Sequence, residues 1–222
     1  MADRARPGQP TKGRAGLTRQ KILDAAGQEF EARGYGGASV NRIIAAAGAT
    51  KGAFYYHFTS KQDLAKKLLQ STLEIDLAPQ SIKLQEIVDT GMLMIYRTTR
   101  EPGLRAALRL SIARDAPTTY GTPWPDWITL SIQQLTEAKA QGELGPDVDI
   151  PMTAHQLAGA WAGLTLITQV VDQNLDEIED RMCTMYKNLL TAVGNPRHVM
   201  LVDFSRDRGR QVHEASVTTP HT

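Results

Sequence analysis

The sequence predicts an all-α protein, in which a small N-terminal helical domain is followed by a larger helical domain. Three observations support this fold class. Apolar residues recur every three or four positions along most of the chain, which is the period of an amphipathic helix. Capping residues and glycines stand at the ends of these periodic stretches. No stretch of useful length alternates apolar and polar residues as a strand does, and the chain shows no internal repeat.

The first expected helix begins at Thr18, which can cap it, and has Ile22 and Phe30 on one apolar face. Gly34 is expected to end this helix, because glycine readily adopts the conformation that follows a helix C-terminus. The preceding residues, 1–16, are rich in Pro, Gly and Arg. They predict a flexible basic arm.

Two short helices follow. Ser39 is expected to cap the second helix and Gly48 to end it. Thr50 then caps a very short third helix, in which Phe54 and Phe58 are neighbours four residues apart. The segment therefore predicts two helices joined by a tight connection.

A fourth helix is expected to begin after Ser60, which caps it, with Asp63 close to the third position of a capping box. Its apolar stripe continues to about Leu77, and Pro79 breaks it. The pattern then predicts five more helices, at residues 81–99, 102–115, 127–142, 152–172 and 176–193.

Two interruptions and a polar tail complete the expected organisation. Residues 116–127 are too rich in Pro and Gly to be helical throughout, and residues 142–151 form a second break. The segment after Gly194 is polar and charged, which predicts a loosely ordered tail. The expected domains are an arm at 1–16, a helical domain at 17–62, a larger helical domain at 63–195 and a flexible tail at 196–222.

Composition indicates an ordinary soluble protein. The chain has 222 residues, of which 41% are hydrophobic and 22% are charged. Its one cysteine, Cys183, excludes an intrachain disulfide and fits a reducing cytoplasm. Because Cys183 lies in an apolar helical stretch, we interpret it as a small core residue, with a redox role as the alternative. No stretch is apolar for long enough to span a membrane, so no membrane partner is expected.

Charge is distributed unevenly along the chain. Residues 1–70 contain 12 Lys and Arg against 5 Asp and Glu, whereas the remainder contains 13 against 19. A basic N-terminal third on an acidic body suggests that one end binds a polyanion, although charge also varies by chance along any chain.

Residues 39–57 have the layout of a helix-turn-helix. A helix of about two turns ends at Gly48, and the next helix has Phe54 on one side and polar residues on the others. Two helices at a steep angle allow the second to enter the major groove of DNA. Hydrogen-bonding side chains would then lie near DNA at Lys51 and at Tyr55, Tyr56 and His57.

The stretch AAAGATKGAFYYHFTSKQDLAKKLL, residues 45–69, resembles the DNA-binding signature of the TetR family of bacterial repressors. The resemblance extends over about residues 17–70 and rests on a long, ordered motif. It implies contacts with bases or phosphates at Asn41, Lys51, Gly52, Ala53, Tyr55, His57 and Lys61. The two capping residues, Ser39 and Thr50, are further phosphate candidates.

Each expected contact has a physical reason. Lys51 opens the recognition helix, where its cation can reach a guanine edge or a phosphate, and Ala53 can touch a thymine methyl group. Three alternatives stay open. Tyr56 either contacts DNA or packs against the first helix, Asn41 either contacts DNA or is merely solvated, and the arm 1–16 either enters the minor groove or is disordered.

The second half of the chain contains no recognisable catalytic or metal-binding pattern. No histidine forms a metal-spaced pair with another ligand on one helix face, and the five are His57, His155, His198, His213 and His221. No phosphate loop or nucleophile elbow is present. We therefore expect neither an enzyme nor a bound cofactor.

Three tryptophans indicate a small-molecule pocket between helices, with core or dimer packing as the alternative. Trp124 and Trp127 flank a proline, and Trp161 lies on another helix. The segments LRLSI (108–112) and PWPDWI (123–128) resemble the γ-butyrolactone autoregulator-receptor branch of the same family. That resemblance implies that Trp127 lines the ligand pocket, although Pro125 and the lack of a preceding His depart from the pattern. Further pocket candidates are Leu110, Gln134, Thr165 and Gln169.

The expected helices 152–172 and 176–193 resemble the family's dimer-forming helices, and their small residues permit close approach. The sequence therefore predicts a helix-turn-helix DNA-binding domain joined to a ligand-binding and dimerisation domain. The predicted function is a homodimeric cytoplasmic repressor of a palindromic operator, released by a γ-butyrolactone or butenolide. The alternatives are a repressor that responds to a drug-like or other metabolic ligand, and a helical DNA-binding protein without an effector.

Overall fold

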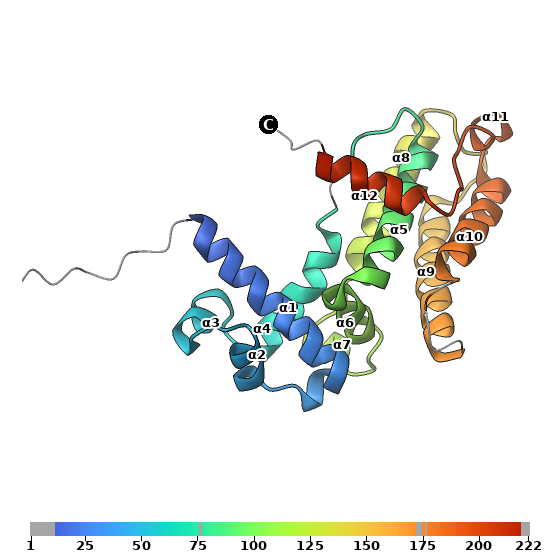
Figure 1. The fold of residues 1–222 in the computed structure, drawn as a ribbon. Helices are drawn as coiled ribbons and strands as arrows, with labels where there is room; N and C mark the ends of the chain where they lie inside the picture. The colour runs from blue at the N-terminus through green and yellow to red at the C-terminus, as the bar shows by residue number, and fades with distance from the viewer. Residues whose placement is uncertain (1–11, 76, 172–174, 176, 219–222) are drawn as a thin grey trace, which may run out of the picture. The chain divides into compact units, whose positions relative to one another are not determined.

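The computed structural model describes residues 12–75, 77–171, 175 and 177–218, and the regular elements of this part of the chain are all helices, apart from one isolated bridge (Figure 1). The all-α prediction is confirmed. The packing divides the chain into two compact units. The first contains the chain up to Leu69 together with Pro102–Gly121, and the second contains Gln70–Glu101 and the chain from Thr122. The domain boundaries expected from the sequence stay predictions.

The first unit is built around phenylalanines from α1 and from the short helices that follow it. Phe30, Phe54 and Phe58 are fully buried together with Ile43 and Leu64. The rings of Phe54 and Phe58 lie 5.8 Å apart, as neighbours four residues apart should. The helices of this unit are α1 (Lys12–Gly37), α2 (Val40–Ala46), α3 (Lys51–His57), α4 (Lys61–Gln70), α6 (Pro102–Ser111) and α7 (Ala116–Thr119).

Two helix ends in the first unit differ from expectation. The helix α1 already includes Lys12, so Thr18 lies inside it and the predicted N-cap is wrong. Gly34 does interrupt the helix, with a φ of 65° that glycine adopts at low cost. Helix α4 stops at Gln70 and tightens into the 3-10 turn η1 (Ser71–Leu73), rather than continuing to Leu77. Ser and Thr are weak helix formers, which favours this early end.

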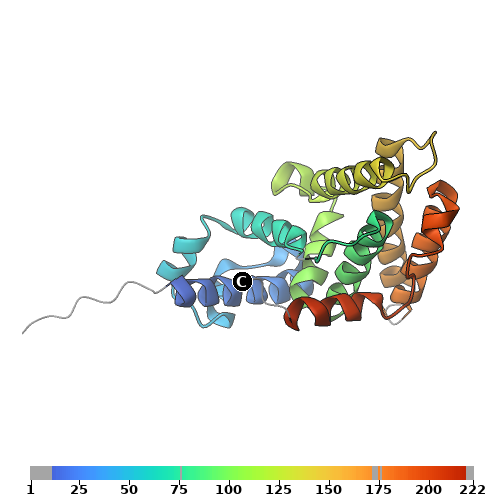
Figure 2. The same ribbon diagram turned by 90° about the horizontal axis from the view of Figure 1, so that it is seen from above.

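The second unit is arranged around α5 (Lys83–Arg100), whose apolar face includes Leu84, Val88 and Ile95. Helices α8, α10 and α12 pack against it, while α9 packs against α8 and α10 (Figure 2). The other elements of this unit are η1, α8 (Trp124–Ala140), α9 (Ile150–Val171), α10 (Ile178–Val193), α11 (Pro196–Val199) and α12 (Arg208–Thr218).

Helix α8 begins three residues earlier than expected, at Trp124, because a proline in the first turn of a helix needs no amide partner. The preceding Pro- and Gly-rich segment contains the single turn α7 and is otherwise irregular, as predicted.

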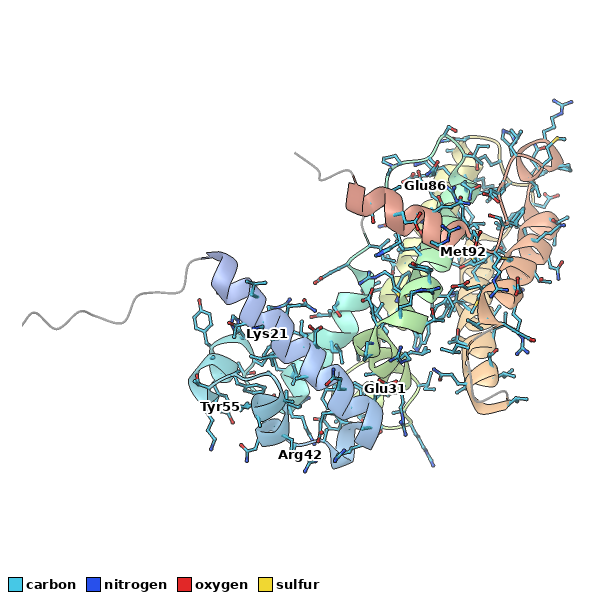
Figure 3. The ribbon with its side chains drawn as sticks, viewed as in Figure 1. Lys21, Glu31, Arg42, Tyr55, Glu86 and Met92 are labelled. Atoms are coloured by element: carbon cyan, nitrogen blue, oxygen red, sulfur yellow. The ribbon has the colours of Figure 1, made fainter. Side chains whose placement is uncertain are left out.

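The described part of the C-terminal segment differs most from expectation. Residues Arg208–Thr218 form α12, which lies across α5 (Figures 1 and 2). The guanidinium of Arg208 contacts both carboxylate oxygens of Asp89, at 2.6 and 2.8 Å. Gly209 lies against the backbone of Met92, whose position on α5 is labelled in Figure 3. Polar composition predicted a loose tail because it does not reveal this distant partner.

Candidate nucleic-acid interface and effector site

The connection between α2 and α3 has the geometry that a helix-turn-helix requires. Gly48 follows α2 with a φ of 59°, which confirms that a glycine ends this helix. The hydroxyl of Thr50 accepts a hydrogen bond from the Ala53 amide at 3.1 Å, so Thr50 caps α3 as predicted. Ser39 occupies the N-cap position of α2, but its side chain makes no capping hydrogen bond. The prediction that the Ser39 side chain caps α2 is therefore wrong.

Helix α3, the recognition helix, places its polar residues in solvent and its phenylalanine in the core. Phe54 is fully buried, whereas Lys51 is exposed and Tyr55 and Tyr56 are 58% and 72% exposed. Figure 3 labels Tyr55 on this helix. The high exposure of Tyr56 excludes the alternative in which it packs against α1. A contact with DNA stays a prediction for each of these side chains.

The small residues of α3 leave its outer surface open. A methyl group added at Gly52 would meet only the Thr50 hydroxyl, at 3.9 Å, so packing does not require glycine there. Ala53 is partly buried, and Asn41 on α2 is exposed. The open surface leaves room for a DNA backbone to approach.

His57 ends α3 in a cationic environment. Partial burial lowers the pKa of His57, and the positive charges of Arg19 and Lys67 lower it further. The imidazole is therefore largely neutral near pH 7 and can still donate one hydrogen bond to a phosphate. No local pattern in the sequence marks Arg19 as part of this site, because its proximity to His57 arises only in the folded chain.

The ammonium of Lys61 is engaged with protein groups. It donates to the carbonyl oxygens of Tyr35 and Ala38 at 2.8 and 3.1 Å and lies over the Tyr35 ring. These contacts hold the turn between α1 and α2. A phosphate contact by Lys61 stays a prediction and would use the third N–H of the ammonium.

Lys67 is a second residue of this site that the sequence motif did not indicate. Its ammonium donates to the backbone carbonyl of His57 at 2.8 Å and pairs with Asp63 at 3.1 Å. The Asp63 carboxylate accepts from the Thr59 amide, while the Asp63 amide donates to the Ser60 hydroxyl. The predicted Ser60 cap is thus confirmed. The spacing of four residues between Asp63 and Lys67 predicts their ion pair, but nothing local reveals the contact with His57.

Glu29 joins α1 to the start of α2. Its carboxylate accepts from the Arg42 guanidinium at 2.6 Å and from the Ser39 amide at 3.2 Å. Desolvation opposes ionisation, but these hydrogen bonds and the nearby arginines outweigh it, so the pKa of Glu29 is below its usual value. Arg42, labelled in Figure 3, also donates to the Gly37 carbonyl. Through these two contacts Arg42 holds α2 against the end of α1 and stabilises the helix-turn-helix.

Several of the predicted ligand residues converge on η1 and α5 within the second unit. The Trp127 indole donates to the Thr72 hydroxyl at 3.4 Å. The Gln134 amide donates to the Thr90 hydroxyl at 2.9 Å. The Trp161 indole donates to the carbonyl of Gly91, the residue after Thr90, at 3.3 Å. Polar atoms from α8 and α9 thus meet at one turn of α5.

The remaining candidates lie elsewhere. Thr165 is buried, and its hydroxyl donates to the Trp161 carbonyl one turn earlier in α9. Trp124 is partly buried at the start of α8, and Gln169 is partly buried on α9. Leu110 belongs to the core of the first unit, where its carbonyl accepts from the Tyr120 hydroxyl at 3.0 Å. The three tryptophans belong to the second unit.

The described part of the chain gives little support for a metal site, a reactive thiol or a membrane-spanning helix. Within it, no three His, Cys, Asp or Glu side chains are placed to hold a metal ion. Burial, followed by the charge of Asp180, raises the pKa of the Cys183 thiol to about 11, which favours the inert thiol over the thiolate. None of the described helices is both long and apolar enough to cross a bilayer.

The fold and the exposed α3 define a helix-turn-helix DNA-binding regulator. A sequence model described as bacterial regulatory proteins of the TetR family matches residues 22–68. The crystal structure of TylP, a TetR regulator from Streptomyces fradiae, is 32% identical, covers 91% of this chain and 98% of its own, and has a TM-score of 0.85. The chain belongs to the TetR family of transcriptional regulators.

Two further relatives agree with this assignment. The A-factor receptor protein of Streptomyces griseus is 28% identical over 187 residues, which cover 83% of this chain and 67% of that protein. A crystal structure described as a gamma-butyrolactone receptor, an ArpA-like protein, is 25% identical and covers 92% of this chain and 100% of its own, with a TM-score of 0.64.

Proposed function

We propose that the protein is a cytoplasmic homodimeric repressor that binds a palindromic operator and is released by a γ-butyrolactone or butenolide. The observation that carries the DNA-binding part is the division of α3 between buried Phe54 and the exposed Lys51, Tyr55 and Tyr56. A short helix anchored in this way presents its polar face to base edges and phosphates.

The outer surface of α9 and α10 supports the dimer. Apolar residues are exposed along α9, with Ile167 56% and Val171 68% accessible. A groove of about 850 Å³ runs between the two helices and includes Ala160, Leu164 and Met185 in its lining. A second copy of the chain would bury this apolar surface, and a two-fold dimer places two recognition helices on one palindrome.

The ligand class is supported by the relatives and by the polar cluster at α5. Two relatives are described as receptors of A-factor and of gamma-butyrolactone. Indole, amide and hydroxyl groups beside aromatic rings suit a small, largely apolar molecule with a few oxygen atoms. We assign Trp127, Gln134 and Trp161 to the binding site, with Trp124, Thr165 and Gln169 as neighbours on the same helices.

Chain connectivity suggests how binding reaches the DNA-binding helices. Thr72, which accepts the hydrogen bond from Trp127, lies in η1 directly after α4. Helix α4 carries Lys61 and Lys67, which hold α2 and α3 in place. A ligand that binds one arrangement of Trp127 and η1 more tightly would shift the population of α4 positions, and with it the spacing of the recognition helices.

The test measures DNA and ligand binding separately. Duplexes selected from a random pool by the wild-type protein are titrated in gel-shift assays, with and without synthetic alkyl-substituted γ-butyrolactones. Lys51→Ala should weaken binding to the selected duplex by about 1–3 kcal/mol while leaving lactone binding unchanged. Trp127→Ala should bind the duplex normally but resist release by lactone.

Each outcome of this test supports or excludes one candidate function. Binding to no duplex at low salt would remove the repressor function altogether. Release by drug-like or metabolic compounds, but by no lactone, would favour the alternative ligand class. Duplex binding that no compound reverses would indicate a DNA-binding protein whose tryptophans only build the core.

A further inference from the structure

Arg19 continues the buried face of α1 beyond the core of the first unit. It stands three residues before Ile22 and seven before Ala26, and both of these residues are fully buried. Residues with these spacings share one face of a helix, so Arg19 lies on the side of α1 that faces the core. Because Arg19 is only partly buried, its guanidinium can reach the surface while its apolar stem covers the core.

The surroundings of Arg19 are positively charged. Helix α1 packs against α3, and the charge of Arg19 acts on His57, the last residue of α3. Lys67 acts on the same imidazole from α4, but its ammonium is paired with the Asp63 carboxylate at 3.1 Å. None of the hydrogen bonds or ion pairs among the described residues involves Arg19.

Two other arginines of the first unit are neutralised within the protein. The guanidinium groups of Arg33 and Arg42 lie 3.8 and 2.6 Å from the carboxylate of Glu29. An arginine held beside further positive groups without a carboxylate creates a positive potential that an anion would relieve. The surface one turn before Arg19 is open, because a methyl group added at Gly16 would meet no atom within 4 Å. An anion as large as a phosphate therefore has room to approach.

We infer that the Arg19 guanidinium binds a phosphate of the DNA backbone beside His57, so that α1 forms part of the DNA interface. The planar guanidinium offers paired N–H donors that match two phosphate oxygens, and the neutral imidazole of His57 can donate one more hydrogen bond there. The inference rests on the proposed DNA-binding function. It extends the interface from the helix-turn-helix at residues 39–57 to a helix outside it.

The test compares three variants of the full-length protein, namely Arg19→Gln, Arg19→Lys and Lys21→Gln. Lys21, labelled on α1 in Figure 3, is exposed and points to nearly the opposite side of the helix, so it is the control for the loss of one charge. Binding to a selected duplex and to a random duplex is titrated at several salt concentrations. The melting temperature of each variant is measured without DNA.

Arg19→Gln should weaken binding to both duplexes alike, by about fivefold at moderate salt. The slope of the logarithm of the binding constant against the logarithm of the salt concentration should decrease in magnitude by about one. Arg19→Lys keeps the charge and should keep the slope, and Lys21→Gln should keep both slope and affinity. All three variants should melt at the wild-type temperature, because no internal contact is lost.

The position of the guanidinium is tested separately in the DNA-free protein. Because the charge of Arg19 lowers the pKa of His57, the pKa of that imidazole, measured by NMR, should rise toward 6.5 in Arg19→Gln and stay unchanged in Lys21→Gln. If this pKa rises but the salt slope remains that of wild type, Arg19 lies beside α3 without binding phosphate. That result overturns the inference and leaves the proposed function intact.

The remaining contrary outcomes are distinct. If Arg19→Gln weakens binding to the selected duplex alone, the arginine reads a base instead of a phosphate, and the inference is overturned. If Arg19→Gln and Arg19→Lys both melt several degrees lower and lose affinity equally, the side chain is structural, which also overturns it. If wild type binds no duplex at low salt, the proposed function fails and the inference fails with it.

Discussion

Three lysines near the recognition helix have the same side chain and different environments. Lys51 is exposed and makes no ion pair or hydrogen bond with the described residues. Lys61 and Lys67 direct their ammonium groups at backbone carbonyls of Tyr35, Ala38 and His57. A free lysine at a helix start can bind a base or a phosphate, whereas the engaged lysines position the backbone that carries it.

At the residue scale, His57 predicts a pH dependence of stability. Because its pKa in the folded chain lies below the usual 6.5, the unfolded chain takes up a proton first as the pH falls. The free energy of unfolding should therefore decrease from pH 6.5 downward until the folded-state pKa is reached. Denaturant titrations between pH 8 and 5 measure this decrease, and His57→Gln should show a smaller one. An identical pH profile for both proteins would contradict the prediction.

At the element scale, α3 depends on its surroundings. A helix of seven residues is too short to be stable alone. Phe54 anchors its inner face, the Thr50 hydroxyl satisfies an amide at its start, and Lys67 satisfies the His57 carbonyl at its end. Packing and capping from neighbouring elements therefore determine its orientation.

Lys67 should act on DNA binding by positioning α3. Lys67→Met should weaken binding to a selected duplex by about tenfold, because the charged hydrogen bond to the His57 carbonyl is lost. Lys67→Arg should retain most of the affinity, and Lys66→Met, which changes an exposed neighbour, should have little effect. The salt dependence of binding separates this role from a phosphate contact. This dependence is the slope of the logarithm of the binding constant against the logarithm of the salt concentration. If the magnitude of that slope decreased by about one for Lys67→Met, Lys67 would bind phosphate instead.

At the scale of the whole molecule, two buried carboxylates in the second unit join parts of the chain that are distant in sequence. The side chain of Glu143 accepts from the amides of Lys83 and Leu84 at 2.9 and 2.8 Å, and so caps the start of α5. Asp89, 1% exposed, pairs with Arg208 on α12. Both contacts make α5 depend on later segments of the chain.

Arg208→Met should destabilise the protein by about 3 kcal/mol, because it leaves the Asp89 carboxylate buried without its cation. Arg210→Met is the matched control, since Arg210 is exposed and pairs only with Asp207 and Glu214 on the surface. Denaturant unfolding of the two variants measures the difference. Equal stability of both variants would show that α12 does not dock on α5 in solution.

Local patterns in the sequence predicted much of the DNA-binding half. The Thr50 cap, the Gly48 turn and the burial of Phe54 depend on residues within four positions of one another, so their consequences can be predicted without a fold. The same holds for the start of α4 at the Ser60 cap. For this reason the sequence alone determined the all-α class and the helix-turn-helix.

Tertiary structure decided which side chains are free to act. The contacts of Lys61 with Tyr35, of Arg208 with Asp89 and of Tyr186 with Gly91 join residues that are 26 to 119 positions apart. No local pattern encodes such pairs, because which partner a side chain meets depends on how separate helices pack. The sequence could therefore predict the helix that contacts DNA, while only the folded chain shows which lysines hold that helix in place.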